Sequence, residues 1–477
     1  MDNKIGKGLF WKLLERFGVQ GSQFLLQLIL ARILSPDHYG VLSMMVIFTT
    51  LANVFIQSGF SAALVQNKNV TQEDYSSVFW VSFGIAGILY GILFFCAPLI
   101  AAFYEMPEIV APLRVLALML LPGALNAVQL AKISREMNFR KVFVSNLSGI
   151  FIAGAVGIYM ALQGFGLWAL VAQMLMNVVV VCLVMSATSG LRLRFACNFR
   201  RVKTLFAYGW KILVSGLIDT LYQDIRALVI GKRYAPDTLG YYNRGKQFPQ
   251  FIITASNGAL QSVLLPAMSR QQDDPQKLRA LTRNSISLSA YIIFPVMAGL
   301  AGVATPLVRL LLTEKWLPAV PYLQIYCFSL AFHPLHTANI QAINAMGRSD
   351  IFLKLEILKK SIGVAALAIA LVWFDSPIAV AMTGVFTALI SGFINAFPNK
   401  KRIGYSFPDQ LKDIAPSAVM TGAMLACVLG IGLLGWPDLV TLCVQILAGA
   451  GVYLTLSLIF KPAPFKQLLT ALKGRKG

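Results

Sequence analysis

The sequence predicts an all-α integral membrane protein with about fourteen transmembrane helices, and three observations support this fold class. Hydrophobic residues make up 57% of the 477 residues. Charged residues make up only 13%, against roughly 25% in soluble proteins. Several long stretches contain no charged residue, and basic residues gather in alternate gaps between apolar stretches.

A membrane-spanning helix needs about 20 mostly apolar residues, because each residue advances about 1.5 Å across a hydrocarbon core of about 30 Å. Residues 142–191 are long enough for two such helices, and the Gln-Gly-Phe-Gly sequence at 163–166 predicts the turn between them. A Trp-Pro-Asp sequence at 436–438 divides the last long apolar stretch. The predicted spans are 10–34, 39–65, 77–103, 110–131, 142–162, 166–188, 205–230, 239–268, 284–312, 318–345, 352–374, 377–397, 414–435 and 438–460.

The distribution of Lys and Arg predicts the orientation of these helices. An even number of spans places both termini on one side. If that side is the cytoplasm, the cytoplasmic segments hold 28 basic residues, and the opposite loops hold three, Lys232, Arg233 and Lys315. The positive-inside rule therefore predicts a multi-pass protein with cytoplasmic termini. The connecting loops are too short for a soluble catalytic domain, so we do not expect an enzyme.

An internal repeat predicts two pseudo-symmetric lobes. Residues 34–40 and 234–240 both read x-x-Pro-Asp-x-x-Gly, a pattern that suits a tight turn with the Asp as a helix cap. Residues 97–100 and 305–308 echo each other in the same order. We expect a six-helix N-lobe at 1–190, a six-helix C-lobe at 191–400, and two further helices with a basic tail at 401–477. Transporters with such repeats place the substrate between the halves.

The first two helices of each predicted lobe are the polar ones, which predicts a hydrated central cavity. Polar and ionisable groups are costly within a membrane and usually face a cavity or a partner. The glutamines of the first helix recur with helical spacing, and the seventh helix is its repeat partner. The candidate substrate-binding residues are Arg16, Gln20, Gln23, Gln27, Gln57, Lys211, Asp219, Gln223, Arg226 and Arg244.

Two other interpretations of these polar residues remain open. They could hold packed helices together, or their side chains could reach toward the lipid headgroups. Asp219 could form an ion pair with Arg226 or Arg16, or it could bind a coupling ion, for which Asp224 is a second candidate. The scattered cysteines and the pair His333 and His336 predict neither a disulfide framework nor a metal site.

Motifs along most of the chain resemble those of a known family. The sequence is similar to the bacterial polysaccharide flippases of the multidrug/oligosaccharidyl-lipid/polysaccharide exporter superfamily, particularly the colanic acid exporter branch. The resemblance covers roughly residues 5–400. It rests on Leu-Ala-Arg-Ile-Leu at 30–34, Gly-Val-Leu at 40–42, Gly-Phe at 59–60, Gln-Asn-Lys at 66–68, Gly-Tyr-Tyr-Asn-Arg at 240–244, Leu-Pro-Ala at 265–267, Gln-Asp-Asp at 272–274, Lys-Leu-Arg at 277–279, Glu-Lys-Trp at 314–316, and Gly347-Arg348 with Asp350.

The resemblance implies a bacterial inner-membrane exporter that moves a polyprenyl-pyrophosphate-linked oligosaccharide by alternating access. Such a substrate would serve lipopolysaccharide, capsule or exopolysaccharide biosynthesis. Membrane lipids and a polysaccharide polymerase are the implied partners, with Na⁺ or H⁺ as the coupling ion and no other cofactor. A cationic cavity would attract the anionic pyrophosphate.

Two alternative functions remain open, one that fits the same polytopic architecture and one that the resemblance to the superfamily implies. A polytopic glycosyltransferase or polymerase would act on the same lipid, although such enzymes normally carry a long extracytoplasmic loop. A multidrug or metabolite exporter of the same superfamily would usually have twelve spans and an acidic cation site near its start. Basic residues in short gaps between apolar stretches indicate membrane orientation and not a nucleic-acid partner.

Overall fold

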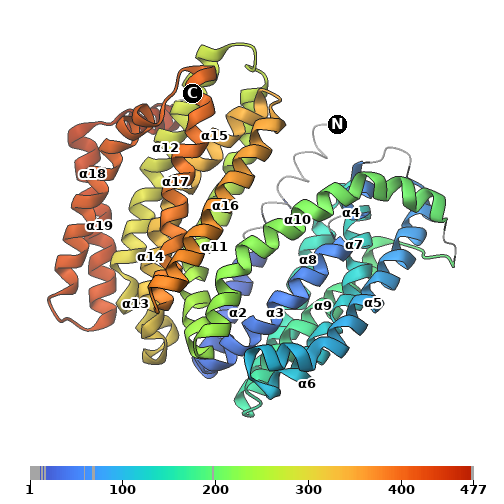
Figure 1. Ribbon diagram of the computed structural model, residues 1–477. Coiled ribbons are helices and arrows are strands. Elements are labelled where there is room, and N and C mark those ends of the chain that lie inside the picture. Colours follow the sequence, from blue (N-terminus) through green and yellow to red (C-terminus); the bar gives the residue numbers. More distant parts are fainter. Residues whose placement is uncertain are drawn as a thin grey trace. The chain divides into compact units, whose positions relative to one another are not determined.

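The fold is entirely helical in the part of the chain that the structure describes. This computed structural model describes Trp11, Leu14 and residues 18–57, 60–66, 70–195 and 198–473 (Figure 1). Within these ranges nine helical segments are long and apolar enough to cross a membrane, which confirms the predicted class. Each of the fourteen predicted spans overlaps at least one helix. The chain forms two compact units, 1–240 and 241–477, while the lobe boundaries at 190 and 400 stay predictions.

The first unit is built from helices joined by short connections, blue to green in Figure 1. Its helices are α2 (Gln20–Ile33), α3 (Pro36–Gln57), α4 (Phe60–Gln66), α5 (Gln72–Tyr104), the 3-10 helix η2 (Pro107–Ile109), α6 (Val110–Ala117), α7 (Leu120–Arg135), α8 (Phe139–Leu162), α9 (Leu167–Ser189) and α10 (Phe199–Arg233). The predicted turn at 163–166 joins α8 to α9, and both of its glycines have positive φ. Glycine tolerates this backbone at no steric cost.

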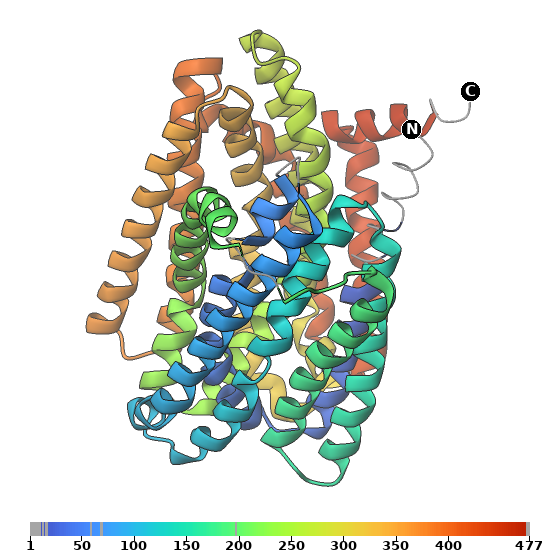
Figure 2. The same ribbon diagram turned by 90° about the vertical axis from the view of Figure 1, so that its right-hand side faces the viewer.

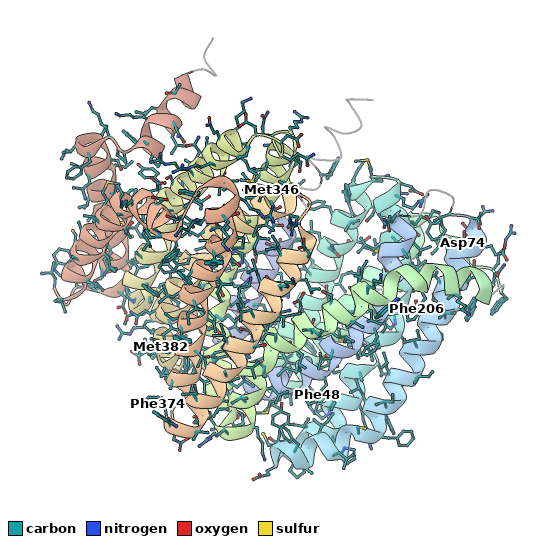
Figure 3. The ribbon with its side chains drawn as sticks, turned by 45° about the horizontal axis from the view of Figure 1, so that its top comes forward. Phe48, Asp74, Phe206, Met346, Phe374 and Met382 are labelled. Carbon is teal, nitrogen blue, oxygen red and sulfur yellow. The ribbon has the colours of Figure 1, made fainter. Side chains whose placement is uncertain are left out.

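Helix α5 shows how the local sequence sets the ends of a span. Thr71 and Asp74 form a capping box, in which each side chain accepts a hydrogen bond from the other residue's backbone N–H. The helix is 33 residues long and contains no charged residue after Asp74. Glu105 closes the helix with a left-handed φ of 59°. Figure 3 labels Asp74 at the start of this helix.

Among the described residues, the predicted spans at 110–131, 284–312 and 318–345 are interrupted, and a proline explains each interruption. The span predicted at 110–131 consists of α6 and α7, which meet four residues before Pro122. A proline at position i cannot donate to the carbonyl at i−4, and its ring collides with that carbonyl. At the first break, Leu118 and Met119 donate instead to carbonyls three residues earlier. The spans at 284–312 and 318–345 break in the same way, shortly before Pro306 and Pro334.

The second unit holds the remaining helices, yellow to red in Figure 1. They are the greater part of α11 (Pro236–Ser269), then α12 (Pro275–Gly302), α13 (Ala304–Leu312), the 3-10 helix η3 (Glu314–Ala319), α14 (Val320–Ala331), α15 (His333–Ala345), α16 (Ser349–Trp373), α17 (Pro377–Ile403), α18 (Phe407–Gly432), α19 (Asp438–Phe460) and α20 (Ala463–Lys473). Figure 3 labels Phe374 and Met382 at the junction of α16 and α17. Helix α20 was not predicted, because the sequence suggested only a basic tail there.

Helices α18 and α19 pack with α12. Met420, Met424 and Tyr453 form an apolar cluster with Tyr291 of α12. The Tyr291 hydroxyl donates to Ser457 Oγ at 2.7 Å, and the Tyr453 hydroxyl donates to the Tyr291 carbonyl at 2.7 Å. Aromatic surface and reciprocal hydrogen bonds therefore join α19 to α12. Figure 2 shows α20, in dark red, running across the end of this group.

The repeated Pro-Asp motif has a different role from the predicted turn. Helices α3 and α11 begin on Pro36 and Pro236, so Asp37 and Asp237 lie in the first turn and do not occupy the capping position. Proline prefers the first helical position because its φ is already helical and the missing N–H has no partner there. Gly40 therefore lies within α3 and not in the turn. A Cβ on Gly40 would overlap the backbone carbonyl of Pro236.

Candidate functional site

Helix α10 carries a stripe of accessible polar side chains. Lys211, Ser215, Asp219 and Gln223 recur at every fourth residue, and all four are exposed. Residues four apart lie on one face of a helix, so the stripe is continuous over about 18 Å. Three of these four residues were predicted from the sequence as substrate-binding candidates, and Ser215 was not. Elsewhere on its surface α10 packs against α3, α4 and α5.

An apolar row lies beside this stripe on α10. Phe206, Trp210, Val214 and Ile218 are exposed at every fourth residue, and the last three each precede a member of the polar row by one residue. Figure 3 labels Phe206 on this helix. The helix thus offers a charged and hydroxyl-bearing row next to an apolar row. Such a surface can contact a molecule that has both a polar head and a hydrocarbon part.

Two of the three arginines nominated from the sequence, Arg226 and Arg244, are buried. Arg226 of α10 is 8% exposed, and its guanidinium lies 5.7 Å from the ring centre of Tyr222. Arg244 of α11 is 4% exposed and lies 5.2 Å from the ring centre of Trp316. The electron-rich face of an aromatic ring attracts a cation, which offsets part of the cost of burial.

Arg244 also belongs to a buried polar and aromatic group at the start of α11. Its Nη1 donates to Gln247 Oε1 at 2.5 Å. The hydroxyls of Tyr242 and Tyr326 are hydrogen-bonded to each other. Trp316 had entered the sequence analysis as part of the Glu-Lys-Trp motif, but nothing in its spacing linked it to Arg244. Only the packing of η3 against α11 brings the two together.

The remaining nominated residues occupy varied environments. Gln20, Gln23 and Gln27 of α2 are half-buried, and Gln57 is exposed at the last turn of α3. Asp224 is half-buried on α10. Arg16 lies outside the described residues. The structure therefore unites Lys211, Asp219 and Gln223 on one surface of the first unit and places Arg226 in its interior.

The C-terminal end of α10 forms an ion pair with the loop after α5. Lys232 Nζ lies 2.8 Å from Glu105 Oε1 of the loop after α5. The hydrogen bond from Lys232 lowers the pKa of the Glu105 carboxyl below its usual value. This pair is exposed, so its contribution to stability is small. Lys232 is also 5.3 Å from the ring centre of Phe103, which fixes the same helix end.

Two helical units, an accessible polar stripe and the nine long apolar segments found among the described residues define a polytopic membrane protein. The model of a family described as polysaccharide biosynthesis protein matches residues 29–321. This match covers more than half of the chain, and the chain belongs to this family.

Known proteins resemble the chain in sequence and in fold. The succinoglycan biosynthesis transport protein ExoT of Rhizobium meliloti (strain 1021) is 27% identical over 327 residues, 68% of this chain. The chain spans 66% of the length of that relative. The lipid II flippase MurJ, in an inward closed conformation, superposes with a TM-score of 0.75 at 15% identity, covering 97% of this chain and 100% of that one.

A multidrug transporter shares the same fold. An inward-facing multidrug resistance MATE family transporter of the MOP superfamily superposes with a TM-score of 0.64 at 16% identity. The superposition covers 82% of this chain and 98% of that one. Because a flippase and a multidrug transporter both match, the fold alone does not decide the substrate.

Proposed function

We propose that this protein is a flippase, which moves a polyprenyl-pyrophosphate-linked oligosaccharide across a bacterial inner membrane by alternating access. Membership of the polysaccharide biosynthesis family is the observation that carries this proposal. The oligosaccharide would be a repeat unit of lipopolysaccharide, capsule or exopolysaccharide, handed on to a polymerase. The protein would work as a transporter and not as an enzyme.

The exposed rows of α10 support this substrate class. Lys211 can donate a charged hydrogen bond to a phosphate oxygen, and Ser215 and Gln223 can exchange hydrogen bonds with sugar hydroxyls. The neighbouring apolar row suits the prenyl chain next to the pyrophosphate. Gln20, Gln23, Gln27 and Gln57 are further candidates for sugar contacts.

A multidrug exporter is the second candidate, and the likeness to the MATE transporter favours it. One reconstitution experiment separates the two functions. Vesicles containing the purified chain are given either a polyprenyl-pyrophosphate-linked oligosaccharide or an organic cation. The proposal expects sugar to become accessible to a modifying enzyme on the opposite side, without cation efflux. Cation efflux without movement of the lipid-linked sugar would refute it.

We further propose fourteen membrane crossings with both termini in the cytoplasm. Under the positive-inside rule, reporter fusions after Arg194 and after Lys412 should report a cytoplasmic location, and a fusion after Glu105 should report an external one. Enzymatic reporters that are active on one side of the membrane make the measurement. A cytoplasmic signal from the Glu105 fusion would overturn the orientation.

Removal of the charge at Lys211 should impair transport. We expect Lys211→Gln to lower the flipping rate by about tenfold, because a charged hydrogen bond contributes about 1.5 kcal/mol. Lys211→Arg keeps the charge and should retain most of the activity. Lys203→Gln changes another exposed lysine of the same helix and serves as the matched control. Equal rates for the Lys211→Gln variant and the wild type would remove Lys211 from the substrate path.

Ion coupling is a separate part of the proposal. Asp219 lies on the exposed stripe of α10, and Asp224 is half-buried one turn further along the helix. Protonation or Na⁺ binding at such a carboxylate would favour one conformation if the ion binds that conformation better. We therefore retain Asp219 and Asp224 as candidates for the coupling site, with H⁺ or Na⁺ as the ion.

A further inference from the structure

A polar cavity lies at one end of α12, α18 and α20 in the second unit. Its volume is about 440 Å³. Arg283, Asn284 and Ser287 come from α12, and Lys412 and Asp413 come from α18. Gln467 of α20 closes the rim, and its Nε2 donates to Asn284 Oδ1 at 3.3 Å. The cavity thus brings two cationic side chains together with hydroxyl and amide groups.

The charges in this cavity leave one net positive charge. Asp413 accepts a hydrogen bond from Arg283 Nη2 at 2.6 Å and another from the Tyr405 hydroxyl at 2.8 Å. Arg283 is still 59% exposed in its side chain, and Lys412 is exposed as well. The carboxylate therefore offsets one of the two cations. The remaining positive charge equals in size the single negative charge of a phosphodiester.

An apolar groove lies further along α12 and α18, the two helices that it shares with the cavity. Its volume is about 460 Å³, and it lies between α12, α18 and α19. Val296, Gly299, Met424, Gly449 and Leu454 are among its lining residues. Ser287 in the cavity and Pro295 in the groove are eight residues apart on α12, which is about 12 Å along a helix.

The position of the cavity relative to the spans suggests what it binds. Arg283 directly precedes one predicted span, Lys412 precedes another, and Lys461 follows a third. A cavity among these residues lies at the level of lipid headgroups, and the groove lies about 12 Å further along α12, on the side of the hydrocarbon region. Basic pockets between membrane helices on the cytoplasmic side bind anionic headgroups.

Helix α20 borders this cavity and turns its polar side toward it. Lys461 ends α19 with a left-handed φ of 42°, and the chain then turns into α20. Phe465 packs on Tyr291 with ring centres 6.4 Å apart, and Leu468 joins the same apolar cluster. Lys466 and Gln467 remain exposed. The apolar side of α20 is thus held by protein, while its polar side is available to headgroups.

We propose that the cavity and groove together form a binding site for one anionic phospholipid. The phosphodiester occupies the cavity beside Arg283 and Lys412, and one acyl chain follows the groove past Gly299. A polyprenyl pyrophosphate has the same general chemistry, but its two phosphate groups carry more negative charge than this cavity balances. The bound phospholipid would tie α18, α19 and α20 to α12.

Native mass spectrometry of the full chain with phosphatidylglycerol tests the headgroup site. The wild type should retain phosphatidylglycerol at least tenfold better than phosphatidylcholine. Lys412→Gln and Arg283→Gln/Lys412→Gln should each lose most of this preference. Lys400→Gln/Lys401→Gln, which removes two exposed lysines from the end of α17, should keep it. Equal loss in both double variants would indicate general surface charge and overturn the site.

The groove has its own test. A Cβ on Gly299 lies 3.8 Å from Met424 Cε, so Gly299→Leu can fill the groove without a backbone clash. Gly451→Leu is the control, because no atom of the described residues lies within 4 Å of a Cβ there. Gly299→Leu should weaken phosphatidylglycerol binding, and Gly451→Leu should not. Unchanged binding in Gly299→Leu would refute the acyl-chain groove.

Competition identifies the ligand. Inorganic phosphate at the same concentration should leave phosphatidylglycerol bound, since it lacks the acyl chain. Displacement by inorganic phosphate would reduce the site to a phosphate pocket. Displacement by polyprenyl pyrophosphate at lower concentration than phosphatidylglycerol would assign the site to the transported lipid, and our proposal would then be wrong.

Discussion

Gly40→Ala is expected to destabilise the protein by at least about 2 kcal/mol, in the upper range for overpacked interiors. A Cβ at residue 40 would overlap the backbone carbonyl of Pro236, and a Cβ at Gly240 would overlap that of Pro36. A backbone carbonyl cannot rotate aside as a flexible side chain can. The starts of α3 and α11 would therefore have to separate, and Gly240→Ala should have a similar effect.

Thermal unfolding in detergent measures this effect. Gly84→Ala in α5 is the matched control, because nothing in the described residues lies within 4 Å of a Cβ there. That change should be neutral or slightly stabilising, since alanine favours helix more than glycine does. If Gly40→Ala and Gly84→Ala unfold at the same temperature, the close contact between α3 and α11 is not part of the folded protein.

Asn339→Leu should cost about 2–4 kcal/mol, because it leaves several buried amide groups without partners. Asn339 Nδ2 donates to Gln410 Oε1 at 2.9 Å, and Gln410 Nε2 donates to Asn339 Oδ1 at 2.9 Å. Asn399 Nδ2 donates to the same Asn339 oxygen at 2.8 Å. All three side chains are fully buried, and they join α15, α17 and α18.

A double-variant cycle measures the coupling between Asn339 and Gln410. Gln410→Leu alone should also destabilise, whereas Asn339→Leu/Gln410→Leu should lose less than the two single losses together. The reason is that removing both partners leaves fewer buried groups unsatisfied than removing one. Strict additivity in thermal or denaturant unfolding would show that the two amides do not interact.

Hydropathy predicted most of the helices because the membrane constrains the chain strongly. A long apolar sequence in lipid must satisfy its backbone hydrogen bonds internally, and a helix does so within one segment. The span predicted at 77–103 accordingly lies within α5, and that at 142–162 lies within α8. A hydropathy profile does not show which backbone hydrogen bonds a proline removes. The breaks before Pro122, Pro306 and Pro334 were therefore not predicted.

The candidate site was predicted in part. Their polarity within a predicted span and the internal repeat selected Lys211, Asp219 and Gln223, and these three share the exposed stripe of α10. Periodicity could not tell which nominated residues are accessible, because accessibility depends on the neighbouring helices. Arg226 and Arg244 are buried beside Tyr222 and Trp316 for that reason.

The sequence by itself determined the membrane class, the approximate spans and the polar character of α10 and α11, because these follow from composition and local periodicity. The tertiary structure alone decided that Gly40 and Gly240 are contact residues and that Arg244 lies on Trp316. It also decided that α12, α18 and α20 enclose a charged cavity. Each of these features joins residues far apart in the chain, so its energy depends on distances that local sequence does not encode.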